Sequence, residues 1–287
     1  MPKVTRSRSL YSLLARAMIC VGLFTGCSID EEPEYVELTV YDLYSQGIEY
    51  LEDGRYRDAS IYFDEVERQH PYSIWATKSK LMSAYSHYQN NKYEDSIASI
   101  DRFIQVHPGN RDVVYAYYLK ALCYYEQISD VQRDQDMTQE ALFALEDVVT
   151  RFPDTVYARD ARLKIDLTRD HLAGKEMTVG RFYLRRSHYL AAINRFKIVI
   201  ENYAATTHAP EALYRLVEAY TALGIKEEAR RSAAVLGYNY PGSDWYLDSY
   251  RLIEEPIPPR SNTNIETASQ AQSPSQGSEE KPWYVFW

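Results

Sequence analysis

Cysteine is scarce in this chain of 287 residues, which has 3 Cys against 27 Tyr. So few cysteines exclude a disulfide framework. Basic residues are also few: the chain has 32 Lys and Arg but 41 Asp and Glu, which gives a formal net charge of −9. A nucleic-acid binder needs clustered Lys and Arg to neutralise phosphates, so we expect no nucleic acid among the partners.

Catalytic and metal-binding motifs are missing from the sequence as well. It contains no GxxxxGK[ST], GxSxG, HExxH or CxxC, and its six His are scattered along the chain. We therefore expect a protein that is not an enzyme and has neither cofactor nor metal site. A hidden pair of catalytic carboxylates stays open as an alternative, although abundant Asp and Glu mostly belong to solvated helix faces.

A long apolar run is missing too, and the most apolar stretch, Ala17 to Thr25, follows four basic residues near the N-terminus. It is too short to span a bilayer, which takes about 20 apolar residues, but it fits a secretory signal. Small residues before Cys27 resemble the lipobox of bacterial lipoproteins, in which the Cys is lipidated. A plain secreted protein with a chance Cys is the alternative.

Composition divides the chain into an N-terminal targeting segment, a folded body and a tail. The tail is rich in Pro, Ser, Gln and Asn, which bury too little apolar surface to fold. Its end, Trp283-Tyr284-Val285-Phe286-Trp287, resembles the closing strand of an outer-membrane barrel, and a tail without a role is the alternative. We expect a signal peptide over 1–26, lipidated Cys27 with an acidic tether over 27–38, a body over 39–253 and a disordered tail over 254–287.

The body repeats itself with a period of 37 residues, since Gly54-Arg55-Tyr56 is echoed by Asn91-Lys92-Tyr93 and Pro71 by Pro108. This pattern is the signature of the tetratricopeptide (TPR) repeat: a small residue where two helices cross, a bulky residue one turn later and a Pro that closes the unit. The sequence predicts an all-α TPR solenoid of five repeats, about ten helices, in a right-handed superhelix. The expected repeats cover residues 40–73, 77–110, 114–155, 156–206 and 210–243, and a closing segment follows the fifth repeat.

Two of the expected repeats are longer than the period. The polar stretch 128–136 predicts a lengthened loop in the third repeat. The fourth repeat carries 14 extra residues without a loop-like stretch, which predicts a longer first helix. Gly174 and Gly180 would permit a kink in it.

Many tyrosines fall on the first helices of the expected pairs, at positions that line the concave groove of a TPR solenoid. Tyr combines apolar area, low rotamer cost and a hydroxyl, which suits peptide recognition. The alternative is that these rings only pack between repeats. The candidate groove residues are Tyr41, Tyr44, Ile48, Leu51, Leu81, Tyr85, Tyr88, Tyr115, Tyr118 and Tyr125.

A lipobox, an acidic spacer and five TPR-like units together resemble the YfiO/ComL family of outer-membrane lipoproteins over about residues 27–253. Two strings carry the resemblance best. They are Leu43-Tyr44-Ser45-Gln46-Gly47 and the more specific Val179-Gly180-Arg181-Phe182-Tyr183 followed by residues 189–195. The aromatic tail has no counterpart in the family core.

The resemblance implies a scaffold of the outer-membrane β-barrel assembly (BAM) complex, anchored by lipid on the periplasmic face of the outer membrane. The implied partners are the BamA-like insertase through a POTRA domain, other BAM lipoproteins and unfolded outer-membrane proteins. Arg195 is implied as a BamA contact, and a solvent-facing helix charge is its alternative. A general periplasmic TPR adaptor lipoprotein is the alternative for the whole chain.

Overall fold

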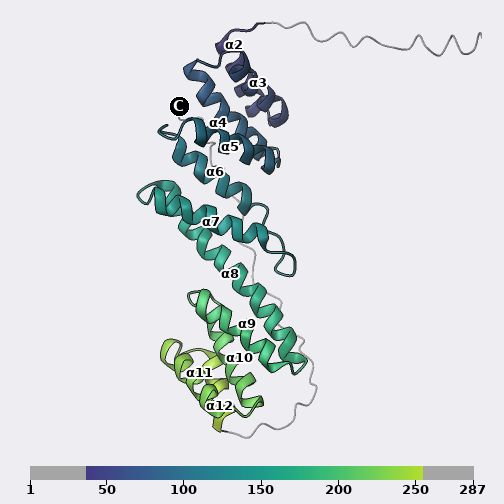
Figure 1. Cartoon of the computed structure of the whole chain (residues 1–287), viewed down its shortest axis with the longest axis vertical. Coiled ribbons are helices and arrows are strands. Elements are labelled where there is room, and N and C mark those ends of the chain that lie inside the picture. The colour runs from purple at the N-terminus through teal and green to yellow at the C-terminus, as the bar shows by residue number, and fades with distance from the viewer. Residues whose placement is uncertain (1–36, 255–287) are drawn as a thin grey trace, which may run out of the picture. The chain divides into compact units, whose positions relative to one another are not determined.

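The structure is a computed structural model that describes residues 37–254. The expected signal peptide, Cys27 with most of the tether, and residues 255–287 lie outside this range. Eleven helices and no strand occur in the described range (Figure 1), so the prediction of an all-α fold of helical repeats is confirmed. The helices are α2 (Val40–Glu52), α3 (Tyr56–Gln69), α4 (Ile74–Gln89), α5 (Tyr93–Val106), α6 (Val113–Tyr125), α7 (Asp136–Arg151), α8 (Val156–Arg185), α9 (Tyr189–Asn202), α10 (Ala209–Ala222), α11 (Lys226–Asn239) and α12 (Asp244–Glu254).

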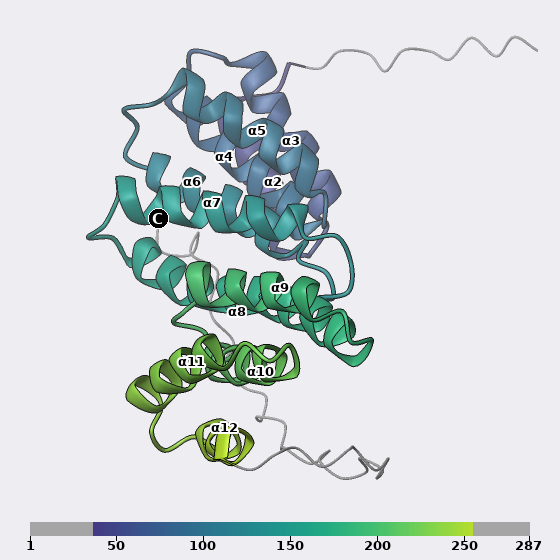
Figure 2. The same ribbon diagram turned by 60° about the horizontal axis from the view of Figure 1, so that its bottom comes forward.

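The chain divides into two compact units, one up to Leu172 and one from Ala173 onward. The first unit contains α2 to α7 and the beginning of α8, and its helices succeed one another as neighbours in Figure 1. The second unit contains the rest of α8 and α9 to α12, and Figure 2 shows α10 and α11 side by side in it. None of the helices between residues 37 and 254 is long and apolar enough to cross a membrane.

The tight turns between the two helices of a pair share one backbone conformation. A residue with positive φ stands two positions before the second helix in four of the five pairs: Gly54 (73°), Asn91 (58°), Ser187 (62°) and Gly224 (76°). The next N–H then donates to a carbonyl five residues back, as from Arg55 to Tyr50 at 2.8 Å. This is the Schellman arrangement, which closes the C-terminus of the first helix.

The third pair lacks this tight turn because residues 126–135 form a longer connection between α6 and α7. The expected loop insertion is therefore present. The second helices end two residues before a proline in four pairs, at Pro71, Pro108, Pro153 and Pro241. A proline cannot continue a helix, so the chain turns there toward the next pair.

The predicted long helix of the fourth repeat is also confirmed, because α8 has 30 residues whereas α4 and α7 have 16 each. Gly180 in this helix lies against the ring of Phe196 of α9, so closely that a Cβ there would overlap the ring. Gly47 of α2 lies against Phe63 in the same way, where a Cβ would come within 2.7 Å of Cε1. Gly180 thus serves a close helix crossing.

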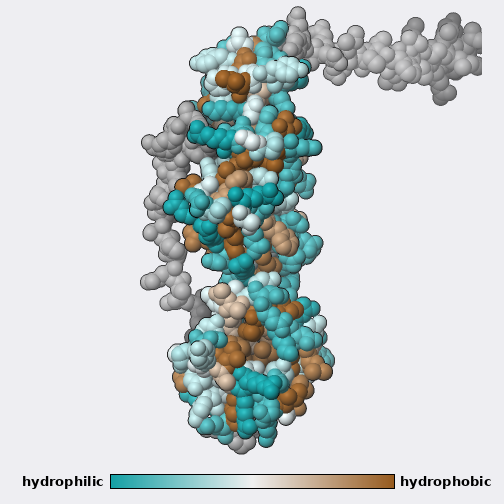
Figure 3. All heavy atoms as spheres, turned by 60° about the vertical axis from the view of Figure 1, so that its left-hand side comes forward, coloured by the Kyte–Doolittle hydropathy of each residue, from teal (hydrophilic) through white to brown (hydrophobic). Residues whose placement is uncertain are grey.

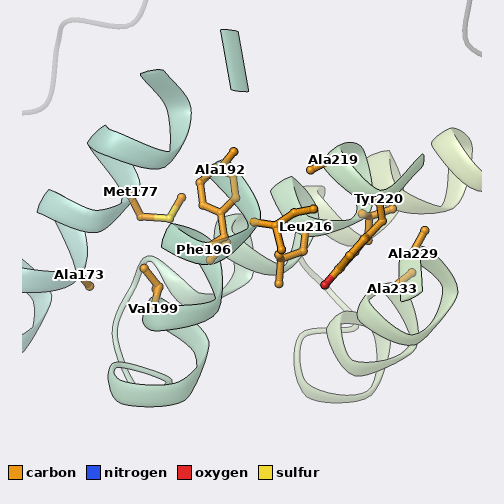
Figure 4. Packing of buried hydrophobic residues seen from close by; sticks show 13 residues of the cluster. Ala173, Met177, Ala192, Phe196, Val199, Leu216, Ala219, Tyr220, Ala229 and Ala233 are labelled. Carbon is orange, nitrogen blue, oxygen red and sulfur yellow. The ribbon is translucent and has the colours of Figure 1, made fainter. Parts of the chain in front are cut away.

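Apolar residues from several helices fill the core of the second unit. In Figure 4, Met177 of α8, Phe196 of α9, and Leu216 and Tyr220 of α10 converge on one another. In the first unit, Leu145 and Val148 of α7 form the corresponding cluster with residues of α6 and α8. Each helix pair thus buries its apolar face against its neighbours, as in other repeat proteins.

The positive φ at Ser187 predicts a stabilising substitution. Left-handed backbone costs an L-residue about 1 kcal/mol, and glycine relieves that cost. We expect Ser187→Gly to raise the free energy of unfolding by about 1 kcal/mol, measured by urea unfolding. The matched variant is Gly224→Ala, whose Cβ would meet no atom within 4 Å, so backbone strain alone should destabilise it. Equal midpoints for both variants and the parent would contradict the prediction.

Candidate functional site

Aromatic rings on successive first helices meet in pairs. Ring pairs at separations of about 4.5–7 Å contribute roughly 0.5–1.5 kcal/mol beyond their buried area. These rings therefore pack between repeats, and their contact with a ligand stays a prediction. The three pairs are Tyr44–Trp75, Tyr118–Tyr157 and Tyr214–Trp245, with ring centroids 4.7, 5.2 and 5.3 Å apart.

Sequence reasoning identified Tyr44 and Tyr118 but missed their partners and both members of the third pair, although a signal for them exists. Trp75 follows Tyr44 by 31 residues, and Trp245 follows Tyr214 by the same number. Tyr157 follows Tyr118 by 39 residues, which is the same spacing plus the eight residues inserted in that repeat. A search for aromatic residues 31 positions apart, with the eight inserted residues of the third repeat left out of the count, would have found all three pairs.

A polar network accompanies the second pair. The Tyr118 hydroxyl donates to Asp160, and Lys164 Nζ lies 2.7 Å from Asp160 Oδ2. The same ammonium group lies 5.6 Å from the ring centroid of Tyr125. Burial raises the pKa of Asp160, but hydrogen bonds from Lys164 and Tyr118 outweigh it and leave the pKa below its ordinary value. The carboxylate is thus ionised at neutral pH and paired with Lys164.

One face of α4 carries the residues of the second repeat. Four residues of α4 are spaced three or four positions apart and so share a face of the helix. They are Lys78, Leu81, Tyr85 and Tyr88. The rings of Tyr85 and Tyr88 stack at 6.4 Å, and the Tyr88 hydroxyl donates to Glu126 Oε1 at 3.4 Å. Burial, and then the charge of Glu126, raise the pKa of Tyr88, so its hydroxyl stays a donor at neutral pH.

The structure divides the predicted groove residues into two groups. Four of them belong to the core, so their assignment to an open groove is corrected: Leu51 is 2% exposed, Leu81 3%, Tyr85 8% and Tyr115 7%. Successive residues of a helix point about 100° apart. The repeat pattern does not show which side of the helix its neighbour covers, so a residue predicted to face the groove can lie in the core instead. Tyr41 is 72% exposed. The half-buried members are Tyr44, Ile48, Tyr88, Tyr118 and Tyr125.

Together with Trp75, the members that keep solvent contact define a candidate site in the first unit. We call it the aromatic surface. Burial raises the pKa of Tyr44 to about 12, so this hydroxyl also stays protonated at neutral pH. The surface can therefore offer apolar rings and hydroxyl donors together. It consists of Tyr41, Tyr44, Ile48, Trp75, Tyr88, Tyr118 and Tyr125.

Sequence reasoning missed three charged groups at this surface: Glu126, which follows α6 and accepts from Tyr88, and the pair Asp160 and Lys164 on α8. The pair lies in the stretch that the sequence assigned to a longer helix without a role. Spacing of four residues places them on one helix face, where such a pair forms readily. The signal was therefore present, but ordinary surface pairs share it.

Arg195 of α9 belongs to the second unit. Its Nη1 lies 3.1 Å from Glu176 Oε2 of α8, and its side chain is 42% exposed. A guanidinium has five N–H donors, so one carboxylate does not exhaust it. The residue is thus neither buried nor a simple solvent-facing charge. It stays a candidate for partner binding.

Cys123 of α6 is a core residue. It is fully buried, and its thiol lies 3.3 Å from Ser96 Oγ. Burial raises the pKa of this thiol to about 11, so the reactive thiolate is rare at neutral pH. Over residues 37–254, no three side chains of His, Cys, Asp or Glu gather into a group that could hold a metal ion.

Hydrophobic residues appear as separate patches among hydrophilic ones on the face seen in Figure 3. Polar side chains therefore interrupt the apolar surface there. Such a mixture permits a ligand to bind through both apolar contacts and hydrogen bonds.

Comparison with known proteins gives one family and several relatives. The family YfiO, described as outer membrane lipoprotein, matches residues 37–236. A protein of Caulobacter vibrioides named outer membrane protein assembly factor BamD is 57% identical over 77% of this chain and 72% of its own length. The protein of that name from Rickettsia prowazekii is 47% identical over 84% of this chain and 96% of its own length. That from Neisseria meningitidis serogroup A is 30% identical over 81% and 91%.

The network around Asp160 makes a prediction about pKa. Tyr118→Phe removes a donor to the carboxylate, so we expect the pKa of Asp160 to rise, measured by NMR titration. Because the folded-state pKa is lowered, the stability it provides is present above about pH 4 and is lost as pH falls further. The variant should thus lose about 0.5–1.5 kcal/mol at pH 7 and progressively less in acid. Tyr41→Phe, on an exposed ring, is the control, and an unchanged Asp160 pKa in Tyr118→Phe would refute the account.

Proposed function

Because the chain belongs to the YfiO family of outer membrane lipoproteins, we propose that it is a scaffold of the outer-membrane β-barrel assembly complex. It binds a BamA-like insertase and helps to recruit and insert nascent outer-membrane proteins. Its relatives are named as assembly factors, and the chain is a non-enzymatic protein of that kind. The observation that carries the proposal is this family membership in a chain whose first unit presents an aromatic surface.

The aromatic surface is proposed as the receptor for unfolded outer-membrane proteins. The closing strand of such a barrel is an extended segment with aromatic side chains at alternate positions. Rings at Tyr44, Trp75 and Tyr118 offer apolar contact to one face of such a strand, and hydroxyls meet its polar groups. A disordered ligand loses entropy when it binds, so affinity stays modest and the ligand can be passed on.

The second unit is proposed to hold the insertase. Arg195 is the candidate contact, because its guanidinium is partly exposed and keeps donors beyond the one that faces Glu176. A carboxylate on a POTRA domain would join Glu176 around the same cation. Other lipoproteins of the complex are proposed partners without an assigned surface.

Lipid on Cys27 is proposed as the anchor to the periplasmic face of the outer membrane. Each buried CH₂ of an acyl chain contributes about 0.8 kcal/mol, and stable anchoring takes more than one chain. Residues 27–38 would then tether the helical units to the membrane. Both the lipid and the cleaved signal are tested by mass spectrometry of the mature N-terminus.

The partner proposal is tested by crosslinked pull-down from membranes with the full chain. Recovery of a large barrel protein with POTRA domains is expected. Arg195→Glu should reduce that recovery about tenfold, since a central charged contact contributes over 1 kcal/mol to binding. The matched control is Arg231→Glu on α11, whose side chain is 74% exposed and paired with Glu228.

Three outcomes separate the possibilities. Loss with Arg195→Glu and retention with Arg231→Glu support the contact. Equal recovery with both variants removes Arg195 from the interface but keeps the partner. Failure of the parent chain to recover any such barrel protein contradicts the scaffold proposal and favours a general periplasmic adaptor.

A further inference from the structure

The chain enters the first unit at a point that hydrogen bonds hold in place. The backbone N–H of Leu38 donates to Gln69 Oε1 at 3.0 Å, and the carbonyl oxygen of Leu38 accepts from His70 Nε2 at 2.8 Å. Gln69 is the last residue of α3, and His70 follows it directly. The last residue of the proposed tether is therefore bound where α3 ends and the turn to α4 begins.

That turn exposes two large apolar side chains to solvent. The N–H of Ser73 donates to the carbonyl oxygen of His70 at 3.0 Å and closes the turn, which contains Tyr72. Tyr72 is 101% exposed, and Ile74, the first residue of α4, is 86% exposed. Among large apolar side chains between residues 37 and 254, only Tyr238 is comparably exposed. We call Leu38, Tyr72 and Ile74 the tether corner.

The repeat architecture does not require large apolar side chains at this turn. The residues at the position of Tyr72 in the other four repeats are small or acidic: Gly109, Asp154, Ala205 and Gly242. Those at the position of Ile74 include one apolar side chain: Arg111, Val156, Thr207 and Asp244. Only the first repeat, which receives the tether, thus combines two large apolar residues at this turn. Packing within the fold does not account for them.

The chemistry of the tether corner suits the interface of a lipid bilayer. A tyrosine ring is apolar with a polar hydroxyl, and such rings collect at the level of lipid headgroups. An isoleucine beside it adds apolar area, with which binding to the interface increases. Charge does not favour anionic lipid here, because residues 28–38 contain five acidic and no basic side chains. Zwitterionic lipid is therefore the fitting partner.

The proposed anchor brings a bilayer within reach of this corner. Leu38 follows Cys27 by 11 residues, which span at most about 40 Å when fully extended. A short connection of this kind keeps the bilayer surface at high effective concentration, so that even a weak apolar contact forms. The corner is also the described part of the first unit to which the tether connects directly.

We propose that the tether corner lies in the bilayer interface, with Tyr72 at the level of the lipid headgroups and Ile74 beside it. The inference rests on the proposed lipid anchor and adds a contact made by the folded first unit. An attachment at Cys27 alone leaves the unit free to rotate, whereas a second contact restricts its orientation. Trp75 of the aromatic surface follows Ile74 directly, so this contact would hold that surface next to the membrane.

The test uses the full chain, purified from membranes and reconstituted into phosphatidylcholine vesicles. Tyr72→Cys and Ile74→Cys each receive the polarity-sensitive dye NBD, and part of the lipid carries a nitroxide quencher on its headgroup. Gly109→Cys is the matched control, because it places the dye at the equivalent turn of the second repeat, where a Cβ meets no atom within 4 Å. Cys123 stays unlabelled, since it is fully buried and its pKa is raised to about 11.

Dye at positions 72 and 74 should emit at shorter wavelength in vesicles and lose most of its fluorescence to the quencher. Dye at position 109 should keep the emission that it has in solution. Adding Ile74→Asp should return the dye at position 72 toward its solution emission, because it removes apolar area from the contact. Adding Tyr238→Asp, at an equally exposed position of the second unit, should leave the dye at position 72 unchanged.

The outcomes separate the corner from the anchor. If the chain stays on the vesicles but dye at positions 72 and 109 is quenched equally, or neither is quenched, the inference is wrong while the anchor stands. Protection of position 72 in native membranes but not in lipid vesicles also overturns it, since the corner then faces a protein. A chain that does not stay on the vesicles, with dye on the thiol of Cys27, contradicts the anchor and the inference together. Circular dichroism of each variant checks that the helices are intact.

Discussion

Each helix pair depends on one close crossing, in which the side chain of the second helix fills the space that a small residue leaves on the first. Gly47 meets Phe63, and Gly180 meets Phe196. The other three crossings occupy the same repeat frame and are also buried. At the equivalent positions of the repeat stand Ala84 and Ile100, Ala121 and Leu145, and Val217 and Ala233. The two partners vary inversely in size, as expected of a core that conserves total volume.

This constraint accounts for the positions of four of the 27 tyrosines. Close crossings bring the helices of each pair together, and successive first helices then face each other through larger side chains. Aromatic rings fill that space in three places, at Tyr44–Trp75, Tyr118–Tyr157 and Tyr214–Trp245. Packing between repeats and display to a ligand are not exclusive, because a half-buried ring keeps one edge in solvent. The same residues can thus build the fold and form its recognition surface.

The fold could be predicted from the sequence because it depends on local, periodic signals. Small residues, bulky residues and prolines recur at fixed spacing, so the helix pairs and even the long α8 were foreseen. The closing helix α12 was not counted, since no second helix follows to complete a pair, and it runs to Glu254, which the sequence assigned to the tail.

The site could be predicted only in part, since its residues come from different repeats. The frame identified Tyr44, Tyr88 and Tyr118 but also four residues that lie in the core. Asp160, Lys164 and Glu126 were missed because single charges on helices are common and carry no periodic signal. Asp160 and Lys164 pair within α8, but Tyr118 and Tyr88, which donate to Asp160 and Glu126, lie on other helices, and only the packed structure brings these groups together.

The central claim is that the aromatic surface of the first unit receives the closing strand of barrel proteins. Photo-crosslinking tests it most directly, with a benzophenone side chain in place of Tyr88 or, as the control, of Tyr238, which is 88% exposed in the second unit. The account predicts that a peptide with a barrel closing-strand sequence crosslinks at position 88, is displaced by unlabelled peptide and does not crosslink at position 238. Equal crosslinking at both positions, or none at position 88, would contradict it.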